Sequence, residues 1–390
     1  MIDLLLGHGQ DPACTPDLLR AIEAYSAVIQ RSAGGGDVHQ VAAAEEAVRA
    51  DPPAAFSFAR SGAATLNAAG QAWRAGAFEV VSVGTLKSRA IAARAAAAGR
   101  QRRARLWVLD GASVATDIGA LQAYAPVDTL FQVASQFNCL EAGGPWVKPV
   151  KSYLTDDTQG PRASISAFPG TLLRHYAAPG AHGGERFVQT NNGRQIELLS
   201  RVCGAGVATA QNGYLLADNI ANPRKFLSAL ESRFDEISVG VHDDVEVALG
   251  YDWDGAVAGP PPPRIGQVFT STLAGGAYGR VSGTFASTCR QLLRAAYLGT
   301  LLAATTLGRP RVVLTLIGGG VFGNPIRLIW EGILWALDQI DSLAAQDMEV
   351  LINGRNLCSQ IEQREILNAV RARGGILLTW PRSGAPVIHR

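Results

Sequence analysis

The sequence predicts an α/β protein, because strand-like and helix-like segments alternate along most of its length. The strand-like segments are short runs rich in β-branched and aromatic residues, whereas the helix-like segments are longer and repeat apolar residues every three or four positions. A strand, a helix and a strand follow one another in residues 78–109 and again in residues 348–379. In residues 311–340 a strand leads through a run of glycines into a helix.

Composition and charge restrict the class of protein. The chain has 390 residues, of which 47% are hydrophobic and 17% charged, and its net charge is +2. These values are typical of a soluble globular protein with one large domain and additions, or with two domains. We expect no nucleic-acid partner, and we interpret the locally basic Arg89–Arg105 as a solvated helix face and connection. No apolar run reaches the roughly 18 residues of a membrane span, and the start, MIDLLLGHGQDP, lacks the basic region of a signal peptide.

The cysteines and histidines predict neither a disulfide framework nor a metal site. The five cysteines are scattered, odd in number and without a Cys-x-x-Cys pair, which fits a reducing compartment and hence a cytoplasmic protein. The six histidines show no spacing typical of metal ligands. The cysteines are Cys14, Cys139, Cys203, Cys289 and Cys358.

We expect three parts along the chain. Residues 1–76 are rich in alanine and are predicted to form an N-terminal helical segment, with helices at Pro16–Arg31, Val38–Ala50 and Ala63–Ala75. Residues 77–345 are expected to form the main α/β domain. Residues 346–390 add a C-terminal strand–helix–strand extension that packs on the same domain.

The main domain is expected to begin with a strand, a helix and two further strands. These are Phe78–Val83, Leu86–Gly99, Arg105–Leu109 and Thr129–Ala134. Next come a short helix or extended run at Ile165–Tyr176 and a hairpin signal at Val188–Gly193, which Gln195–Ser200 continues. Helices are expected at Asn222–Phe234 and Phe285–Ala304, and strands at Ile237–Val247 and Gly266–Thr272. The C-terminal extension is expected to consist of a strand at Met348–Ile352, a helix at Gln360–Arg373 and a strand at Gly375–Thr379. Asp243 interrupts the apolar face of Ile237–Val247, which predicts that this strand ends or bulges near His242.

The glycine-rich stretch after Arg311–Ile317 has the features of an anion site. Gly318–Gly323 follows the strand, Asn324 is a good helix N-cap, and Pro325 suits the first helical position. Unpaired backbone N–H groups and the positive end of the helix dipole then point at one place, and glycines let a diphosphate approach closely. The alternative is a tight strand-to-helix connection that needs small residues for packing alone.

Two further strand ends carry loops rich in amide side chains or glycine. These loops are Ser135–Glu141 and Thr270–Gly279. With Asp156–Gly160 and Gln189–Asn192 they suggest one extended cleft for a polar ligand that carries phosphate and ribose. The glycine loop is not a Walker A sequence, which argues against a kinase. It also lacks the GxGxxG pattern with a later acidic residue, which argues against a dehydrogenase.

In combination, these loops resemble the macrodomain superfamily. LIGGGVFGNP resembles the macrodomain loop that wraps the diphosphate of ADP-ribose, and FQVASQFNCLEAGGP resembles its first ligand loop. VASQFNCLE, DDTQGPRAS and VFTSTLAGGAYG narrow the resemblance to a distant branch near the poly(ADP-ribose) glycohydrolases, the MavL group of bacterial effectors. It covers roughly residues 78–345. The chain lacks the Gln-Glu-Glu that follows the first loop in glycohydrolases, so the resemblance does not place the catalytic acid.

The resemblance implies a three-layer α/β/α fold with a mixed sheet and an ADP-ribosyl hydrolase with no metal or other cofactor. It also implies an ADP-ribosylated partner protein, with ubiquitin as the candidate, and delivery into a host cytosol if the chain is an effector. The glycine loop would hold the diphosphate, the amides of the first loop the ribose, and aromatic rings would stack on the ligand. The expected ligand-binding residues are Gln136, Phe137, Asn138, Thr270, Gly318, Gly319, Gly320, Val321, Phe322, Gly323 and Asn324.

Hydrolysis of an ADP-ribose linkage needs acidic groups beside the ribose. A carboxylate stabilises the cation-like ribose or activates water, and another group protonates the leaving atom. The densest acidic cluster, Asp235, Asp243, Asp244 and Glu246, is therefore the expected catalytic group. Glu141, beside the first loop, is a weaker candidate. The alternative for the cluster is a solvated turn and a charged edge strand.

Two other functions remain open. A reader would bind ADP-ribose without cleaving it, and it differs from a hydrolase in whether the carboxylates of the acidic cluster point into the same cleft as the glycine loop. Another nucleotide-dependent enzyme, a transferase or oxidoreductase, would require a catalytic lysine or an acidic residue for the ribose of NAD, and neither is apparent.

Overall fold

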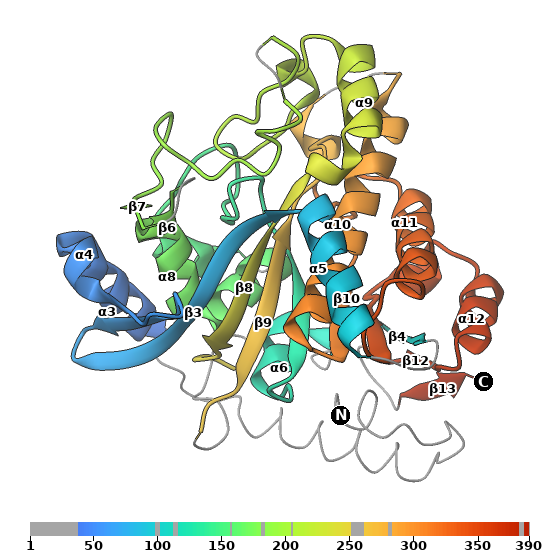
Figure 1. The fold of residues 1–390 in the computed structure, drawn as a ribbon, viewed down its shortest axis with the longest axis horizontal. Coiled ribbons are helices and arrows are strands. Elements are labelled where there is room, and N and C mark those ends of the chain that lie inside the picture. The colour runs from blue at the N-terminus through green and yellow to red at the C-terminus, as the bar shows by residue number, and fades with distance from the viewer. Residues whose placement is uncertain are drawn as a thin grey trace.

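A mixed β-sheet between two layers of helices forms the centre of the molecule (Figure 1). The computed structural model describes residues 38–97, 102–111, 116–156, 158–180, 184–203, 206–250, 261–279, 283–381 and 386–389. The helix expected at Pro16–Arg31 lies outside these residues. The expected three-layer α/β/α arrangement with a mixed sheet is confirmed within them.

The described residues contribute eleven strands to this sheet, in the order β1-β2-β3-β8-β9-β5-β10-β11-β4-β12-β13. Their bounds in that order are Phe56–Phe58, Ala64–Ala68, Gln71–Ser82, Ser238–Glu246, Arg264–Thr270, Thr129–Ala134, Arg311–Thr315, Met348–Asn353, Ala104–Asp110, Leu377–Thr379 and Val387–His389. Strands β9, β5, β10, β11, β4 and β12 are mutually parallel, whereas both ends of the sheet are antiparallel. The carboxyl ends of the parallel strands therefore share one edge, where ligands bind in open α/β sheets.

The helices cover both faces of the sheet. Helices α5, α10, α11 and α12 lie together on one face, and α3, α7 and α8 lie on the other (Figure 1). Their bounds are Val83–Ala96, Phe285–Leu307, Ile326–Ile340, Gln363–Ala372, Val38–Ala50, Gln159–Ser166 and Phe168–Tyr176; Pro52–Ala55 (α4), Ile118–Ala123 (α6) and Pro223–Ser232 (α9) complete the α-helices in the described part of the chain. No helix among the described residues is long and apolar enough to span a membrane.

Strand β8 shows how the two helix layers meet the sheet. Val239 faces α10, where Gly299 leaves too little room for a larger side chain, and His242 faces Gly170 of α8. The pairing of β8 with β9 shifts between His242 and Val245, and Asp244 has a left-handed φ of 62°. The bulge predicted near His242 is thus confirmed.

Two predicted elements are wrong. The helix expected over Ala63–Ala75 is instead the antiparallel pair β2 and β3, which turns at residues with positive φ, Ala69 and Gly70. Side chains along β2 alternate between buried and more exposed, and this packing in the sheet outweighs the helix propensity of its alanines. The hairpin expected from Val188 to Ser200 is absent from the described residues, which there form turns fixed by side-chain hydrogen bonds of Gln189 and Gln195.

Candidate functional site

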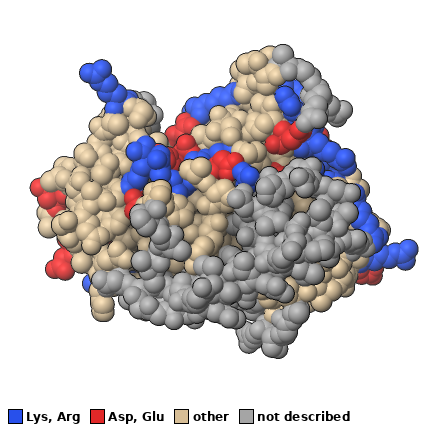
Figure 2. All heavy atoms as spheres, turned by 90° about the horizontal axis from the view of Figure 1, so that it is seen from below, with Lys and Arg blue, Asp and Glu red and all other residues tan. Residues whose placement is uncertain are grey.

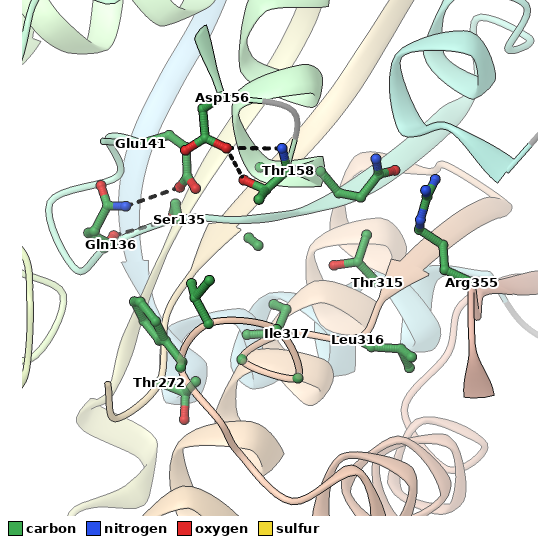
Figure 3. Close-up of a pocket in the computed structure, with 18 of the residues that line it drawn as sticks. Ser135, Gln136, Glu141, Asp156, Thr158, Thr272, Thr315, Leu316, Ile317 and Arg355 are labelled. Carbon is green, nitrogen blue, oxygen red and sulfur yellow. Dashed lines mark hydrogen bonds between the residues drawn. The ribbon is translucent and has the colours of Figure 1, made fainter. Parts of the chain in front are cut away.

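A cavity of about 450 Å³ lies at the carboxyl ends of the parallel strands. This volume falls in the range of small-molecule sites, roughly 300–1,000 Å³. Its walls come from loops that follow β5, β9, β10 and β11, and from the start of α7 (Figure 3). The lining residues are Ala134, Ser135, Gln136, Glu141, Ala142, Gly143, Asp156, Thr158, Gln159, Gly160, Tyr214, Thr272, Tyr278, Thr315, Leu316, Ile317, Gly318, Gly319, Gly320, Val321, Phe322, Ile326, Asn353, Gly354, Arg355, Asn356 and Gln360.

The glycine loop lines one wall of this cavity with backbone N–H groups. The N–H groups of Gly318 and of residues 320–322 donate to no acceptor within the described residues. Gly318 has a φ of 73°, and a Cβ there would lie 2.4 Å from Thr272 Cγ2 and 2.8 Å from Asn324 Nδ2, so only glycine fits. Ile326, the first residue of α11, also lines the cavity, which brings the positive end of the helix dipole to the same place. Together these groups can bind an anion.

The helix start differs by one residue from the prediction. Pro325, rather than Asn324, is the N-cap of α11, and it makes no side-chain cap. Asn324 is buried, its Oδ1 accepts from Thr272 Oγ1 at 2.8 Å, and its Nδ2 donates to the Leu273 carbonyl at 2.9 Å. Asn324 therefore ties the glycine loop to the loop after β9 instead of capping the helix.

Three aromatic rings form a corner of the cavity beside the glycine loop. The centroid of the Phe322 ring lies 5.5 Å from those of both Tyr214 and Tyr278. Tyr214 OH accepts from the Gly144 N–H at 3.0 Å and donates to the Ala142 carbonyl, so this ring connects the first loop with the glycine loop. The corner holds both loops at a fixed spacing and offers ring faces to a ligand.

A buried arginine and a buried glutamine donate hydrogen bonds to backbone carbonyls of the first loop. Arg174 is 1% exposed, its Nε donates to the Cys139 carbonyl at 3.1 Å, and its guanidinium carbon lies 3.6 Å from the centroid of the Phe269 ring. Gln189 Nε2 donates to the Asn138 carbonyl at 3.1 Å. Cys139 has a φ of 60°, which is unusual for a residue other than glycine. These contacts fix a strained turn that leads directly to Glu141.

Glu141 is a half-buried carboxyl group in the cavity wall. Gln136 Nε2 donates to its Oε2 at 3.2 Å, and Tyr153 OH accepts from its backbone N–H at 3.1 Å. Burial raises the pKa of Glu141 well above its usual range, the charge of Asp156 raises it further, and the bond from Gln136 opposes both effects. A carboxyl group in such surroundings keeps its proton to higher pH than an exposed one and can donate it.

A second carboxylate, Asp156, lies beside Glu141. Figure 3 shows both groups on one side of the cavity, with Leu316 and Ile317 across from them at the start of the glycine loop. Asp156 Oδ1 accepts from the Thr158 N–H at 2.9 Å and from Thr158 Oγ1 at 2.7 Å. No cationic side chain of the described residues forms an ion pair with Glu141 or Asp156.

The far end of the cavity contains unpaired polar atoms. Asn353 is 3% exposed and Thr315 is 8% exposed, yet Asn353 Oδ1 and Thr315 Oγ1 have no hydrogen-bond partner among the described residues. Buried polar atoms rarely stay unpaired, so both oxygens are suited to a bound group. Asn353 Nδ2 is fixed by the Thr116 carbonyl at 2.9 Å, which leaves its oxygen as an acceptor.

The acidic cluster expected to be catalytic lies outside the cavity. Asp243 pairs with Arg309, just before β10, whereas the glycine loop follows β10. Asp244 pairs with Arg74 and Arg264, and Glu246 accepts from the Arg74 N–H at 2.9 Å. In the β8–β9 pairing Glu246 is opposite Arg264, at the start of β9, so the length of β9, about 20 Å at 3.3 Å per residue, separates these acids from the carboxyl-end edge.

Asp235 is also misplaced for catalysis. It precedes β8, its side chain is 56% exposed, and it pairs with Lys87 of α5. None of the four expected catalytic acids lines the cavity. Asp235, Asp243 and Asp244 form ion pairs with lysine or arginine, and Glu246 accepts a backbone hydrogen bond. On the face seen from below in Figure 2, acidic and basic side chains are likewise interleaved. The alternative interpretation of this cluster, a solvated turn and a charged edge strand, is wrong about the edge, because β8 lies between β3 and β9 within the sheet.

The expected ligand-binding residues divide into two groups. Gln136 and residues 318–322 line the cavity, and their role in binding stays a prediction. Phe137, Asn138, Thr270, Gly323 and Asn324 do not line it. Asn138 is 1% exposed, and its side chain pairs with Gln195 Oε1 and the Leu140 N–H. Gln136 holds Glu141, so an amide on a strand-end loop can serve its own loop as readily as a ligand.

Several lining residues were not predicted. Residues 353–356 begin with the last residue of β11 and form an Asn-Gly-Arg-Asn run, which is the same polar strand-end pattern that indicated the first loop. Asp156 and residues 158–160 were expected in the cleft without a specific role. Tyr214 lies in a loop far from every other lining segment in sequence, and no local pattern marks it.

The comparisons with known proteins found similar solved structures and no match to a family model or a curated protein. Among solved structures, poly(ADP-ribose) glycohydrolase from Thermomonospora curvata matches at 15% identity and a TM-score of 0.38, covering 86% of this chain and 99% of that one. The Deinococcus radiodurans enzyme in complex with ADP-ribose matches at 11% identity and a TM-score of 0.35, covering 76% and 93%. The T. curvata enzyme bound to the inhibitor ADP-HPD matches at 13% identity and a TM-score of 0.37, covering 80% and 92%. The chain is therefore similar to poly(ADP-ribose) glycohydrolase structures, at low sequence identity.

Proposed function

We propose that this protein is a hydrolase that binds ADP-ribose and removes it from a modified protein. The observation that carries this proposal is one cavity with two complementary walls. One wall presents backbone N–H groups of the glycine loop that have no acceptor, and the other presents Glu141, whose pKa is raised mainly by burial. An anion site beside a proton-donating acid is the arrangement that cleavage of a phosphorylated sugar linkage requires.

The proposal orients the ligand across the cavity. The diphosphate binds the N–H groups of Gly318 and residues 320–322, which supply positive potential without a charged side chain. The terminal ribose then lies toward Glu141, on the opposite side. The adenine lies toward Asn353, whose unpaired Oδ1 can accept from an amino group.

In this orientation Glu141 protonates the leaving atom. Gln136 donates to Oε2, so the proton of the neutral carboxyl group belongs on Oε1. General acid catalysis of this kind contributes roughly 10²–10⁴-fold to a rate. A reader that binds ADP-ribose without cleaving it would need the glycine loop and would have no use for a carboxyl group with a raised pKa.

The test is to incubate the purified protein with ADP-ribosylated ubiquitin and with a second ADP-ribosylated protein, and to measure released ADP-ribose. We expect release from at least one substrate and saturable binding of free ADP-ribose by calorimetry. Binding without release from either substrate would support the reader instead. No binding at all would contradict both functions.

A glycine variant controls for the site. Nothing lies within 4 Å of a Cβ added at Gly320, and its φ is outside the left-handed range, so Gly320→Leu preserves the fold while its side chain enters the cavity. We expect this variant to lose ADP-ribose binding at least 50-fold. Gly283→Leu is the matched control, because Gly283 is equally open and does not line the cavity. Equal affinity of both variants would refute the loop assignment.

A further inference from the structure

We propose that Asp156 is a second catalytic residue, whose Oδ2 takes a proton from the water that attacks the anomeric carbon of the bound ribose. This inference rests on the proposed hydrolase function. It assigns the second half of the acid–base chemistry to a residue from a different segment, fifteen positions after Glu141.

The geometry of Asp156 suits a base. Its Oδ1 is fixed by two donors on Thr158, and no described residue donates to its Oδ2. The fixed oxygen prevents rotation of the carboxylate, and the other oxygen remains an acceptor for water. Oδ2 lies 3.7 Å from the position of a Cβ at Gly143, which lines the cavity, so this oxygen faces the first loop and the site beside Glu141. Figure 3 shows the same arrangement of the two side chains.

Asp156 and Glu141 are built alike but in different surroundings. In each carboxyl group the described residues donate to one oxygen and not to the other. Burial raises the pKa of Glu141, and the charge of Asp156 favours its protonated form. Two neighbouring carboxyl groups whose environments differ in this way divide into an acid and a base.

No other titratable group of the described cavity lining can act as this base. Tyr214 OH is engaged with the first loop by two hydrogen bonds, Tyr278 packs its ring against Tyr214 and Phe322, and Arg355 carries a permanent positive charge. The buried histidines His175 and His242 do not line the cavity. Glu141 is needed in its protonated form. Asp156 is the remaining group.

The step balances without any further reactant. The oxygen of water forms a bond with the anomeric carbon while the bond to the leaving oxygen or nitrogen breaks. The electron pair of the broken bond stays on the leaving atom, which takes the proton from Glu141 Oε1. The water proton moves to Asp156 Oδ2, and exchange with solvent then restores both carboxyl groups.

The experiment measures kcat, KM and ADP-ribose affinity of Asp156→Asn and Asp156→Ala, with and without sodium azide. Azide is already an anion and needs no base, so it can attack the ribose where the missing side chain leaves space. We expect a kcat at least 100-fold lower for both variants, with KM and the dissociation constant of ADP-ribose within threefold of wild type. We expect azide to raise the turnover of Asp156→Ala at least tenfold and to yield ADP-ribosyl azide.

Two control variants separate chemistry from structure. Thr158→Val removes the hydroxyl that fixes Oδ1 and keeps the carboxylate, so we expect a loss in kcat of less than tenfold. Glu231→Gln neutralises an exposed acid on α9 and should leave kcat unchanged. Preserved ADP-ribose binding in every variant shows that the protein has folded.

The possible outcomes are distinct. A kcat of Asp156→Asn within threefold of wild type overturns the role of Asp156, and so does a lost turnover that azide leaves unrelieved. Failure of the proposed function itself would appear earlier, as wild-type protein that binds ADP-ribose and releases none. That result would overturn both proposals before any substitution is made.

Discussion

The molecule contains two groups of acidic residues at opposite ends of its central strands, and they differ in their partners. At one end Asp243 and Asp244 pair with arginines that come from β3, β9 and the segment just before β10. At the other end Glu141 and Asp156 face a cavity and have no arginine or lysine partner among the described residues. The first group is denser in sequence, yet only the second lines the cavity beside the glycine loop.

We infer from this contrast that countercharge distinguishes the structural carboxylates from those proposed to react. Asp243 and Asp244 each accept from an arginine of another segment, which suits a connection between strands. An acid that is half-buried with only an amide partner loses water without gaining a cation, so its proton is held more tightly. Perturbed groups of this kind cluster at functional sites.

The largest expected effect is a difference in rate between variants of the two groups. Glu141→Gln should lower kcat for ADP-ribose release about 10³-fold, within the range of general acid catalysis, because glutamine cannot give a proton to the leaving atom. Asp244→Asn should leave kcat within twofold. Asparagine tolerates the positive φ of Asp244, so the bulge in β8 is preserved.

Affinity measurements make this comparison decisive. Both variants should bind ADP-ribose within threefold of wild type, since neither substitution changes the glycine loop. A larger loss of kcat in Asp244→Asn than in Glu141→Gln would reverse the assignment of the two groups.

The next effect is on stability. Arg309 is 8% exposed, its Nε donates to Asp243 Oδ1 at 2.7 Å, and its NH1 donates to the Thr129 carbonyl at 3.2 Å. Arg309→Met leaves these acceptors unpaired and should lower the free energy of unfolding by about 3 kcal/mol, as for other broken buried ion pairs. Urea denaturation measures this change. Where the variant is still folded, its ADP-ribose affinity should equal that of wild type.

An exposed ion pair is the control for this variant. Arg233 pairs with Glu236 at the surface, and Arg233→Met should change the urea midpoint much less. If Arg309→Met left the midpoint unchanged but weakened ADP-ribose binding, the arginine-rich end would have to be part of the site after all.

Most of the fold could be predicted from the sequence because its signals are local. Thr129–Ala134 has the predicted bounds of β5, and α10 and α11 follow from apolar periodicity. Residues 63–75 could not be predicted in this way, because alanine is a good helix former and the pairing of β2 with β3 and of β3 with β8 outweighs that preference.

The site was predictable only in part because its walls come from distant segments. Gln136 and residues 318–322, which line the cavity, were expected in a ligand site because glycines and amides at strand ends indicate ligand loops. The acidic group was misplaced because local density of carboxylates says nothing about which arginines reach them in the fold. Asp243 is 66 positions from Arg309, and this separation leaves no local pattern.

A smaller effect concerns pH. Because the pKa of Glu141 is raised in the folded protein, the folded chain binds more protons than the unfolded chain above the usual carboxyl pKa. The stability that this proton contributes is present at low pH and is lost as pH rises through the raised pKa. Relative to wild type, Glu141→Gln should therefore gain about 1.4 kcal/mol in free energy of unfolding per pH unit within that window. Urea denaturation at several pH values measures the difference, and a difference independent of pH would contradict the environment described for Glu141.

The smallest expected effect tests how Glu141 is positioned. Tyr153 is 2% exposed, and its OH accepts from the Glu141 N–H at 3.1 Å. Tyr153→Phe keeps the ring but leaves that N–H unpaired, so the backbone beside the acid becomes less fixed, and kcat should fall about threefold to tenfold with unchanged ADP-ribose affinity. The same substitution in a Glu141→Gln background should have no further effect on kcat, because Tyr153 acts only through the acid. Additive losses in the double variant would show that Tyr153 supports the cavity in general. Glu141 would then be positioned by Gln136 and Arg174 instead.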